Sequence, residues 1–154
     1  MASKGINLAE ECKVVPLLHP VSGSTTSDII NMKNYQHASI VVTQGVGASA
    51  ITMTVRGSDD NASTTSSAIS FQYYSEASSG IDILGARTSG GAASGFDMTS
   101  GSNQFCVIEV DASELPSGQS FMLLEMEESE NLVGVTAVLS GARYKLDQSP
   151  TVQS

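Results

Sequence analysis

Apolar and polar residues alternate along several segments of the chain with a period of two. In Ile51–Arg56 the odd-numbered residues are apolar and the even-numbered ones are polar. This period places successive side chains on opposite faces of a pleated strand, so one face meets a core and the other meets water. β-branched residues at both kinds of position favour the same geometry. The segment is therefore predicted to be a half-buried strand.

Two hairpins are predicted in the first half of the chain. The apolar run within Ala38–Gln44 is followed by the short glycine-containing connection Gly45–Ala48 and then by Ile51–Arg56. Two strands joined in this way are typical of an antiparallel hairpin. Ile69–Tyr74 also alternates, and small residues separate it from the short apolar run Ile81–Leu84. These two runs predict a second hairpin.

Three longer apolar runs lie towards the C-terminus. We predict that they are adjacent antiparallel strands, formed by Gln104–Val110, Ser120–Met126 and Val133–Leu139. The acidic break Glu127–Asn131 would be costly to bury, so it is placed at the surface. Asp111–Leu115 can form one helical turn, because its Asp and Glu stand at the spacing of a capping box.

Two earlier segments, Lys13–Leu18 and Ser27–Met32, bring the total to about eight or nine strands at the spacing of a sandwich or jelly roll. A proline within the first segment confines it to a sheet edge or a strand end. Ser58–Ser67 and Thr88–Ser102 are so rich in small and polar residues that we predict long loops there.

The predicted fold class is all-β, an antiparallel β-sandwich or jelly roll of about eight strands with flexible terminal arms. The 154 residues suit one domain, which we place at residues 12–146, between an N-terminal arm at 1–11 and a C-terminal tail at 147–154. The predicted core comprises Ile40, Val42, Ile51, Met53, Val55, Phe71, Ile108, Leu124 and Val135.

Charge excludes some partners. Sixteen Asp and Glu against seven Lys and Arg give a formal net charge of −9, and the basic residues are scattered. Such a chain is repelled by phosphate backbones and by anionic lipid, so we expect neither direct nucleic-acid binding nor membrane docking. We also see no signal peptide and no run of about 20 apolar residues. Synthesis in a cytoplasm is the expectation.

Candidate chemistry is sparse. Cys12 and Cys106 lack a CxxC partner, so we interpret both as buried thiols rather than metal ligands or a disulfide. His19 and His37 stand at no metal-binding spacing, which favours structural or solvent-exposed roles. Neither a GxSxG elbow nor a GxxxxGK[ST] loop occurs in the sequence. We therefore expect no catalytic residue, no metal and no cofactor.

One acidic segment leaves a question open. Asp59 and Asp60 lie beside Asn61, and together they could supply oxygen ligands to calcium. The EF-hand spacing and its terminal glutamate are absent, so a polar turn between strands is the favoured interpretation.

The chain resembles small virion structural proteins of tailed bacteriophages, of the head-decoration or capsid-cement type. The resemblance extends over about residues 30–145 and rests on Asn34–Tyr35, Ile51–Val55 with its polar loop, Ile69–Tyr74 and Leu139–Tyr144. It implies a β-rich protein that forms homo-oligomers, with a trimer favoured, and that binds the major capsid protein on the capsid exterior. It implies no catalytic residue.

The resulting expectation is a non-enzymatic structural protein of a phage virion that stabilises the capsid lattice. The alternatives are a phage tail component or a carbohydrate-binding β-sandwich module, and the lack of Trp disfavours the latter. In the N-terminal arm, Ile6 and Leu8 are the sizeable apolar residues, and we predict that they contact the capsid. A frayed terminus is the alternative for this segment.

Overall fold

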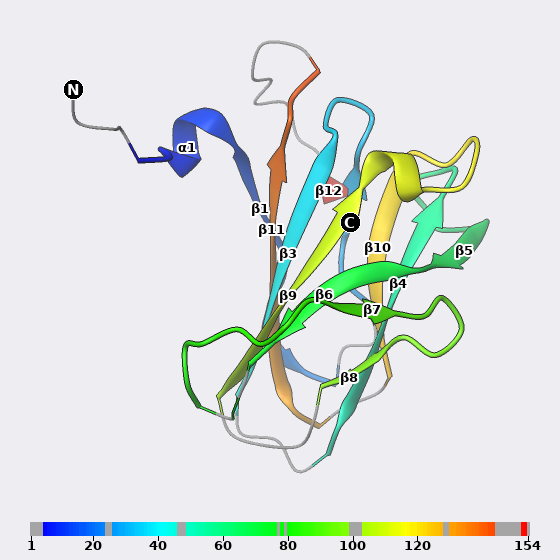
Figure 1. The fold of residues 1–154 in the computed structure, drawn as a ribbon. Helices are drawn as coiled ribbons and strands as arrows, with labels where there is room; N and C mark the ends of the chain where they lie inside the picture. The colour runs from blue at the N-terminus through cyan, green and yellow to red at the C-terminus, as the bar shows by residue number, and fades with distance from the viewer. Residues whose placement is uncertain are drawn as a thin grey trace.

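Two antiparallel sheets packed face to face form the body of the protein (Figure 1). The computed structural model describes residues 5–23, 26–45, 49–76, 78, 80–98, 103–127, 130–143 and 152–153. Over these residues the only helices are α1 (Leu8–Glu11) and a 3₁₀ turn at Ala112–Glu114. The predicted all-β sandwich is therefore confirmed.

The two sheets, called A and B, have six strands each. Sheet A contains the first strand of the chain. Its strand order is β1 (Lys13–Ser22), β11 (Leu132–Ser140), β3 (His37–Gln44), β9 (Gln104–Asp111), β6 (Phe71–Ser75) and β7 (Thr88–Gly90). Sheet B has the order β12 (Val152–Gln153), β2 (Ile29–Asn31), β10 (Phe121–Met126), β4 (Ile51–Ser58) and β5 (Ser66–Ile69), with β8 (Phe96–Met98) also paired to β4.

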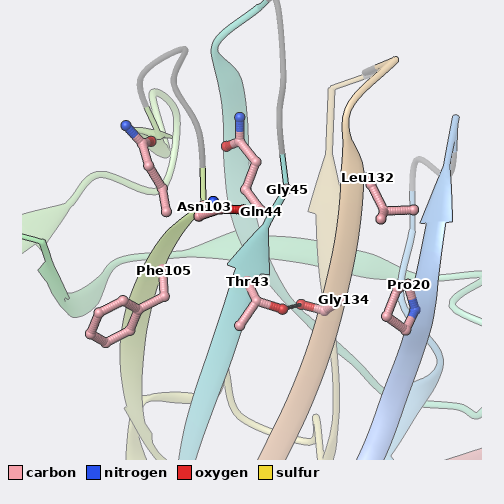
Figure 2. A pocket seen from close by; sticks show the side chains of 9 residues that line it. Pro20, Thr43, Gln44, Gly45, Asn103, Phe105, Leu132 and Gly134 are labelled. Carbon is pink, nitrogen blue, oxygen red and sulfur yellow. Dashed lines mark hydrogen bonds between the residues drawn. The ribbon is translucent and has the colours of Figure 1, made fainter. Parts of the chain in front are cut away.

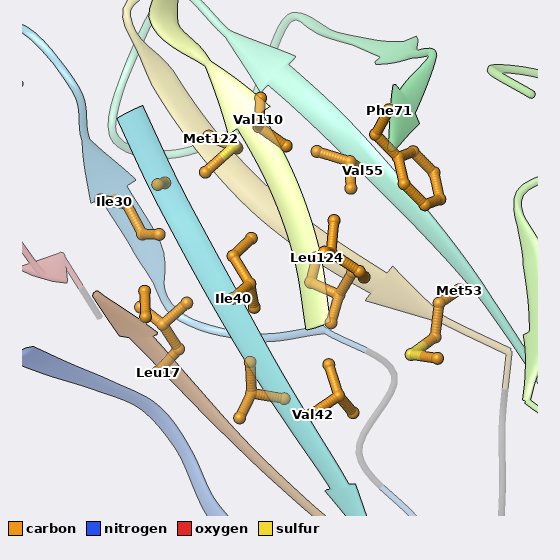
Figure 3. Close-up of a cluster of buried hydrophobic side chains, with 14 of the residues drawn as sticks. Leu17, Ile30, Ile40, Val42, Met53, Val55, Phe71, Val110, Met122 and Leu124 are labelled. Atoms are coloured by element: carbon orange, nitrogen blue, oxygen red, sulfur yellow. The ribbon is translucent and has the colours of Figure 1, made fainter. Parts of the chain in front are cut away.

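The core lies between the two sheets, where alternate residues of each strand point inward. All nine residues of the predicted core are buried, none more than 5% exposed. Figure 3 shows several of these side chains filling the space between the layers. The period-two pattern placed them correctly because a strand with one face on a core must alternate.

The predicted hairpin between β3 and β4 is wrong. β3 lies in sheet A between β11 and β9, whereas β4 lies in sheet B between β10 and β5. The chain therefore passes from one layer to the other between them, and residues 46–48 of this connection lie outside the described residues. An arch between sheets and a hairpin within one sheet leave the same alternation in the sequence, so the pattern could not separate them.

The three C-terminal strands exist, but they are not adjacent. β9 and β11 belong to sheet A with β3 between them, while β10 lies in sheet B. The chain thus changes layer at each connection. The capping box after β9 is confirmed, since the backbone N–H of Asp111 donates to Glu114 Oε2 at 2.8 Å.

The second predicted hairpin is also wrong. β6 pairs with β7 and β9, and the run at 81–84 makes a single bridge, between Leu84 and Glu76. Ile81, Ile83 and Leu84 are exposed, so their apolar character marks no buried strand. The predicted loop Thr88–Ser102 contains β7 and β8, which are only three residues long each.

The ends of the chain behave differently from each other. β1 is an edge strand of sheet A, as its prolines predicted, and it continues past Leu18 to Ser22 through two irregularities in its register. Residues 152–153, within the predicted tail 147–154, form β12 and pair with β2. The helix α1 of the N-terminal arm has no buried residue.

Candidate functional site

The outer face of sheet A carries a band of mainly apolar side chains across its central strands, with polar residues on either side. One row runs through Pro16, Thr136, Val41, Val107 and Tyr74, which are paired strand to strand. These residues are half-buried or exposed, and they alternate with the core residues of the same strands. The neighbouring row brings the exposed Val14 beside Val138.

This face differs from the outer face of sheet B. There Arg56 pairs with Glu125 at 3.0 Å, and Thr52 donates to Asp97 at 2.7 Å, so polar groups satisfy one another. At the centre of sheet A, Val41 and Val107 are register partners at outward positions, and Phe105 is the next outward residue of β9. This apolar band on the outer face of sheet A is the candidate interaction surface.

An open hollow of about 430 Å³ lies at one end of this face, across β1, β11, β3 and β9. Figure 2 shows Phe105 on one side and Pro20 on the other, with Thr43 and Gly134 between them. A side chain at position 134 would crowd Thr43 and Pro20, with its Cβ 3.1 Å from Thr43 Oγ1. The hollow therefore stays open at position 134 because glycine has no side chain.

Gln44 stands behind the hollow, at an inward position at the end of β3. It is 2% exposed, and neither atom of its side-chain amide has a hydrogen-bond partner among the residues that the structure describes. A buried amide without partners costs free energy of about 1–3 kcal/mol relative to a bonded one.

A cluster of charged groups lies at the opposite end of β3. His37 Nδ1 is 2.8 Å from Asp111 Oδ1, and His37 Nε2 is 2.7 Å from Glu109 Oε2. Ser39 donates its hydroxyl to the same Glu109 oxygen at 2.6 Å. Strand pairing creates this cluster, because His37 is the register partner of Asp111 and Ser39 that of Glu109.

The cluster favours the protonated form of His37. Partial burial lowers the pKa of His37, but the hydrogen bonds and charges of Asp111 and Glu109 outweigh this and raise the pKa above its ordinary value of 6.5. In the protonated ring both nitrogens donate to these carboxylates. The arrangement ties β3 to β9.

The acidic segment after β4 is a turn that Asp60 holds together. Its carboxylate accepts hydrogen bonds from the Thr64 hydroxyl at 2.7 Å and from the backbone N–H groups of Ala62 and Thr64 at 3.1 Å. These bonds, led by that of the Thr64 hydroxyl, keep the pKa of Asp60 below its ordinary value. Donors of its own loop therefore satisfy the Asp60 carboxylate, as expected for a polar turn.

The remaining candidate residues are dispersed. Ile6 and Leu8 are 78% and 45% exposed, and His19 is exposed on β1. Cys106 is buried, whereas Cys12 is only half-buried, which corrects the interpretation of both as buried thiols. Within the described ranges no three His, Cys, Asp or Glu residues gather to hold a metal ion, and no helix is long and apolar enough to cross a membrane.

Comparisons with known proteins give one likeness. No family model matches the chain, and no curated protein matches it. The crystal structure of the SPBc2 prophage-derived protein YomS is similar, with a TM-score of 0.52 over 84% of this chain and 92% of that chain. The two sequences are 12% identical, so this likeness shows a shared fold.

Sequence reasoning missed the hollow and the His37 cluster. Both depend on β3 lying between β11 and β9, and the predicted hairpin had paired β3 with β4 instead. One signal for the hollow was present, because Gln44 continues the series of inward positions Ala38, Ile40 and Val42. A polar residue at an inward position at a strand end calls for a partner.

Proposed function

We propose that this chain is a non-enzymatic structural protein of a bacteriophage virion, which binds the outside of the capsid as an oligomeric decoration protein. The observation that carries the proposal is the apolar band on the outer face of sheet A, which includes Val41 and Val107 on the two central strands. A surface of this kind suits binding to a protein, because burial of apolar area is its main driving force.

Two further features support a virion role. The fold is shared with a prophage-derived protein, which fits a phage origin for this chain as well. The acidic net charge of −9 suits a protein that lies outside the shell, away from packaged nucleic acid. In the His37 cluster both ring nitrogens face carboxylate oxygens, which fits a structural role for this histidine.

The expected binding free energies suit a protein that binds a repeating lattice. Burying one valine side chain stabilises a complex by roughly 1.5–3 kcal/mol, while association itself costs about 4–15 kcal/mol. A few valines therefore give a weak single contact. A capsid repeats its binding sites, and an oligomer that contacts several of them gains avidity without new contacts.

Co-sedimentation with purified capsid shells tests the proposal. The double variant Val41→Thr with Val107→Thr keeps the β-branched shape but places hydroxyls on the outer face of sheet A. We expect it to fold normally and to bind shells about tenfold more weakly or worse. The matched control Ile83→Thr changes an exposed residue outside sheet A and should bind like the wild type.

The same assay with purified tails separates the head role from the tail role. Binding to tails without binding to shells would overturn the decoration role and favour a tail component. Equal binding of the wild type and the double variant to shells would remove the outer face of sheet A from the contact.

A further inference from the structure

The apolar residues of the N-terminal arm are not covered by the rest of the described structure. Ile6 and Leu8 are exposed, α1 buries none of its side chains, and Figure 1 shows α1 standing away from the sheets at the Lys13 end of β1. Exposed apolar side chains on a short projecting segment are stabilised when another surface covers them.

Among the described surfaces, the hollow is apolar and uncharged, which suits the side chains of Ile6 and Leu8. Phe105, Pro20 and Leu132 give it apolar walls, and none of its nine lining residues carries a charge. In a chain with a net charge of −9, an uncharged site is where an arm that contains Glu10 and Glu11 meets least repulsion.

The arm of one copy cannot reach the hollow of the same copy. Lys13 and Pro20 are seven residues apart along β1, a distance of about 23 Å at the strand rise. Ile6 is seven residues before Lys13, but four of the intervening residues form α1, so the arm extends at most about 16 Å. Ile6 can therefore reach a hollow at the Pro20 end only on another molecule.

We infer that Ile6 and Leu8 of one copy bind in the hollow of a second copy of this chain, against the apolar walls formed by Phe105, Pro20 and Leu132. This goes beyond the proposed function, because a contact between copies stands whether or not the oligomer binds a capsid. Ile6 and Leu8, which the sequence suggested as capsid contacts, then contact a second copy instead.

Site-directed cross-linking between two differently tagged copies tests the inference. One copy carries Leu8→Cys and the other Leu132→Cys, both with Cys12→Ser to remove the half-exposed native thiol. Cys106 can stay, because burial, with a smaller contribution from the charge of Glu76, raises the pKa of its thiol to about 12. A short bismaleimide should then join the two copies. Leu84→Cys in place of Leu132→Cys is the control, since it is exposed but lies away from the hollow.

The expected result is a mixed-tag product with L132C and only background product with L84C. Equal yields from the two positions would overturn the inference. So would a cross-link confined to one chain when L8C and L132C are combined in a single dilute copy.

Molar mass by light scattering gives an independent measurement. The wild type should be oligomeric, and Ile6→Ser with Leu8→Ser should reduce the mass to that of one chain. Leu132→Glu at the rim should do the same, while Leu84→Glu should leave the oligomer intact. A monomeric wild type, or an oligomer that survives both the arm and the rim variants, would overturn the inference. Circular dichroism confirms that each variant remains folded.

Discussion

Individual residues of this protein fall into two groups with different consequences. Met53 and Leu124 are fully buried in neighbouring strands of sheet B, so their side chains contribute to stability. His37 lies at a strand end between two carboxylates, and its contribution depends on its protonation. The first group is insensitive to pH and the second is not.

Truncation of the core residues should be costly. Met53→Ala and Leu124→Ala each remove most of a fully buried side chain, which should lower the free energy of unfolding by about 2–4 kcal/mol. Urea unfolding measures this as a lower midpoint. Ile83→Ala, at a residue that is 61% exposed, should leave the midpoint nearly unchanged. Wild-type midpoints for both core variants would contradict the burial of these residues.

The His37 cluster should make stability depend on pH. The pKa of His37 is raised in the folded protein, so its contribution is fully present below the ordinary value of 6.5 and is lost as pH rises through the folded value. His37→Gln removes this titration. The difference in unfolding free energy between wild type and variant should therefore shrink as pH rises above 6.5. A difference that stays constant from acid to alkaline pH would contradict the imidazolium pairs.

At the scale of elements, the sequence predicts strands better than it predicts their partners. β3, β4, β9, β10 and β11 all lie where the alternation placed them. Their pairing does not follow, because a run such as Ile40–Val42 supplies an apolar residue to either face and fits an arch as well as a hairpin. The hollow depends on the pairing of β3 with β11 and β9, so the neighbours of Gln44 could not be predicted from the sequence. The exposure of Ile6 and Leu8 could be anticipated, because it does not depend on strand pairing.

The short strand β7 depends on one glycine. Phe71 of β6 is the register partner of Gly90, and a Cβ at position 90 would overlap the Phe71 ring. Gly90→Ala should therefore destabilise the protein by about 1–3 kcal/mol, as overpacking does. Adding Phe71→Leu should cost less in the Gly90→Ala background than in the wild type, because the smaller side chain relieves the overlap. Chemical denaturation of the four proteins measures this coupling, and strictly additive effects would refute it.

The whole molecule carries a net charge of −9, so any association between copies works against repulsion. An association driven by apolar side chains in an uncharged hollow should strengthen when salt screens that repulsion. Sedimentation between about 0.05 M and 0.5 M sodium chloride should show a rising oligomer fraction. A falling fraction would instead point to ion pairs between the copies.

The arm and the hollow lie at opposite ends of β1, and this separation has a consequence for growth. A copy that has donated its arm still presents an empty hollow. Two copies can therefore fill each other's hollows only when they lie antiparallel. At any other angle the next copy adds to the open end, and addition stops when the ring closes or continues as a filament. The angle between neighbours would then set the number of copies. A copy without its arm could accept but not donate, and it would act as a chain terminator.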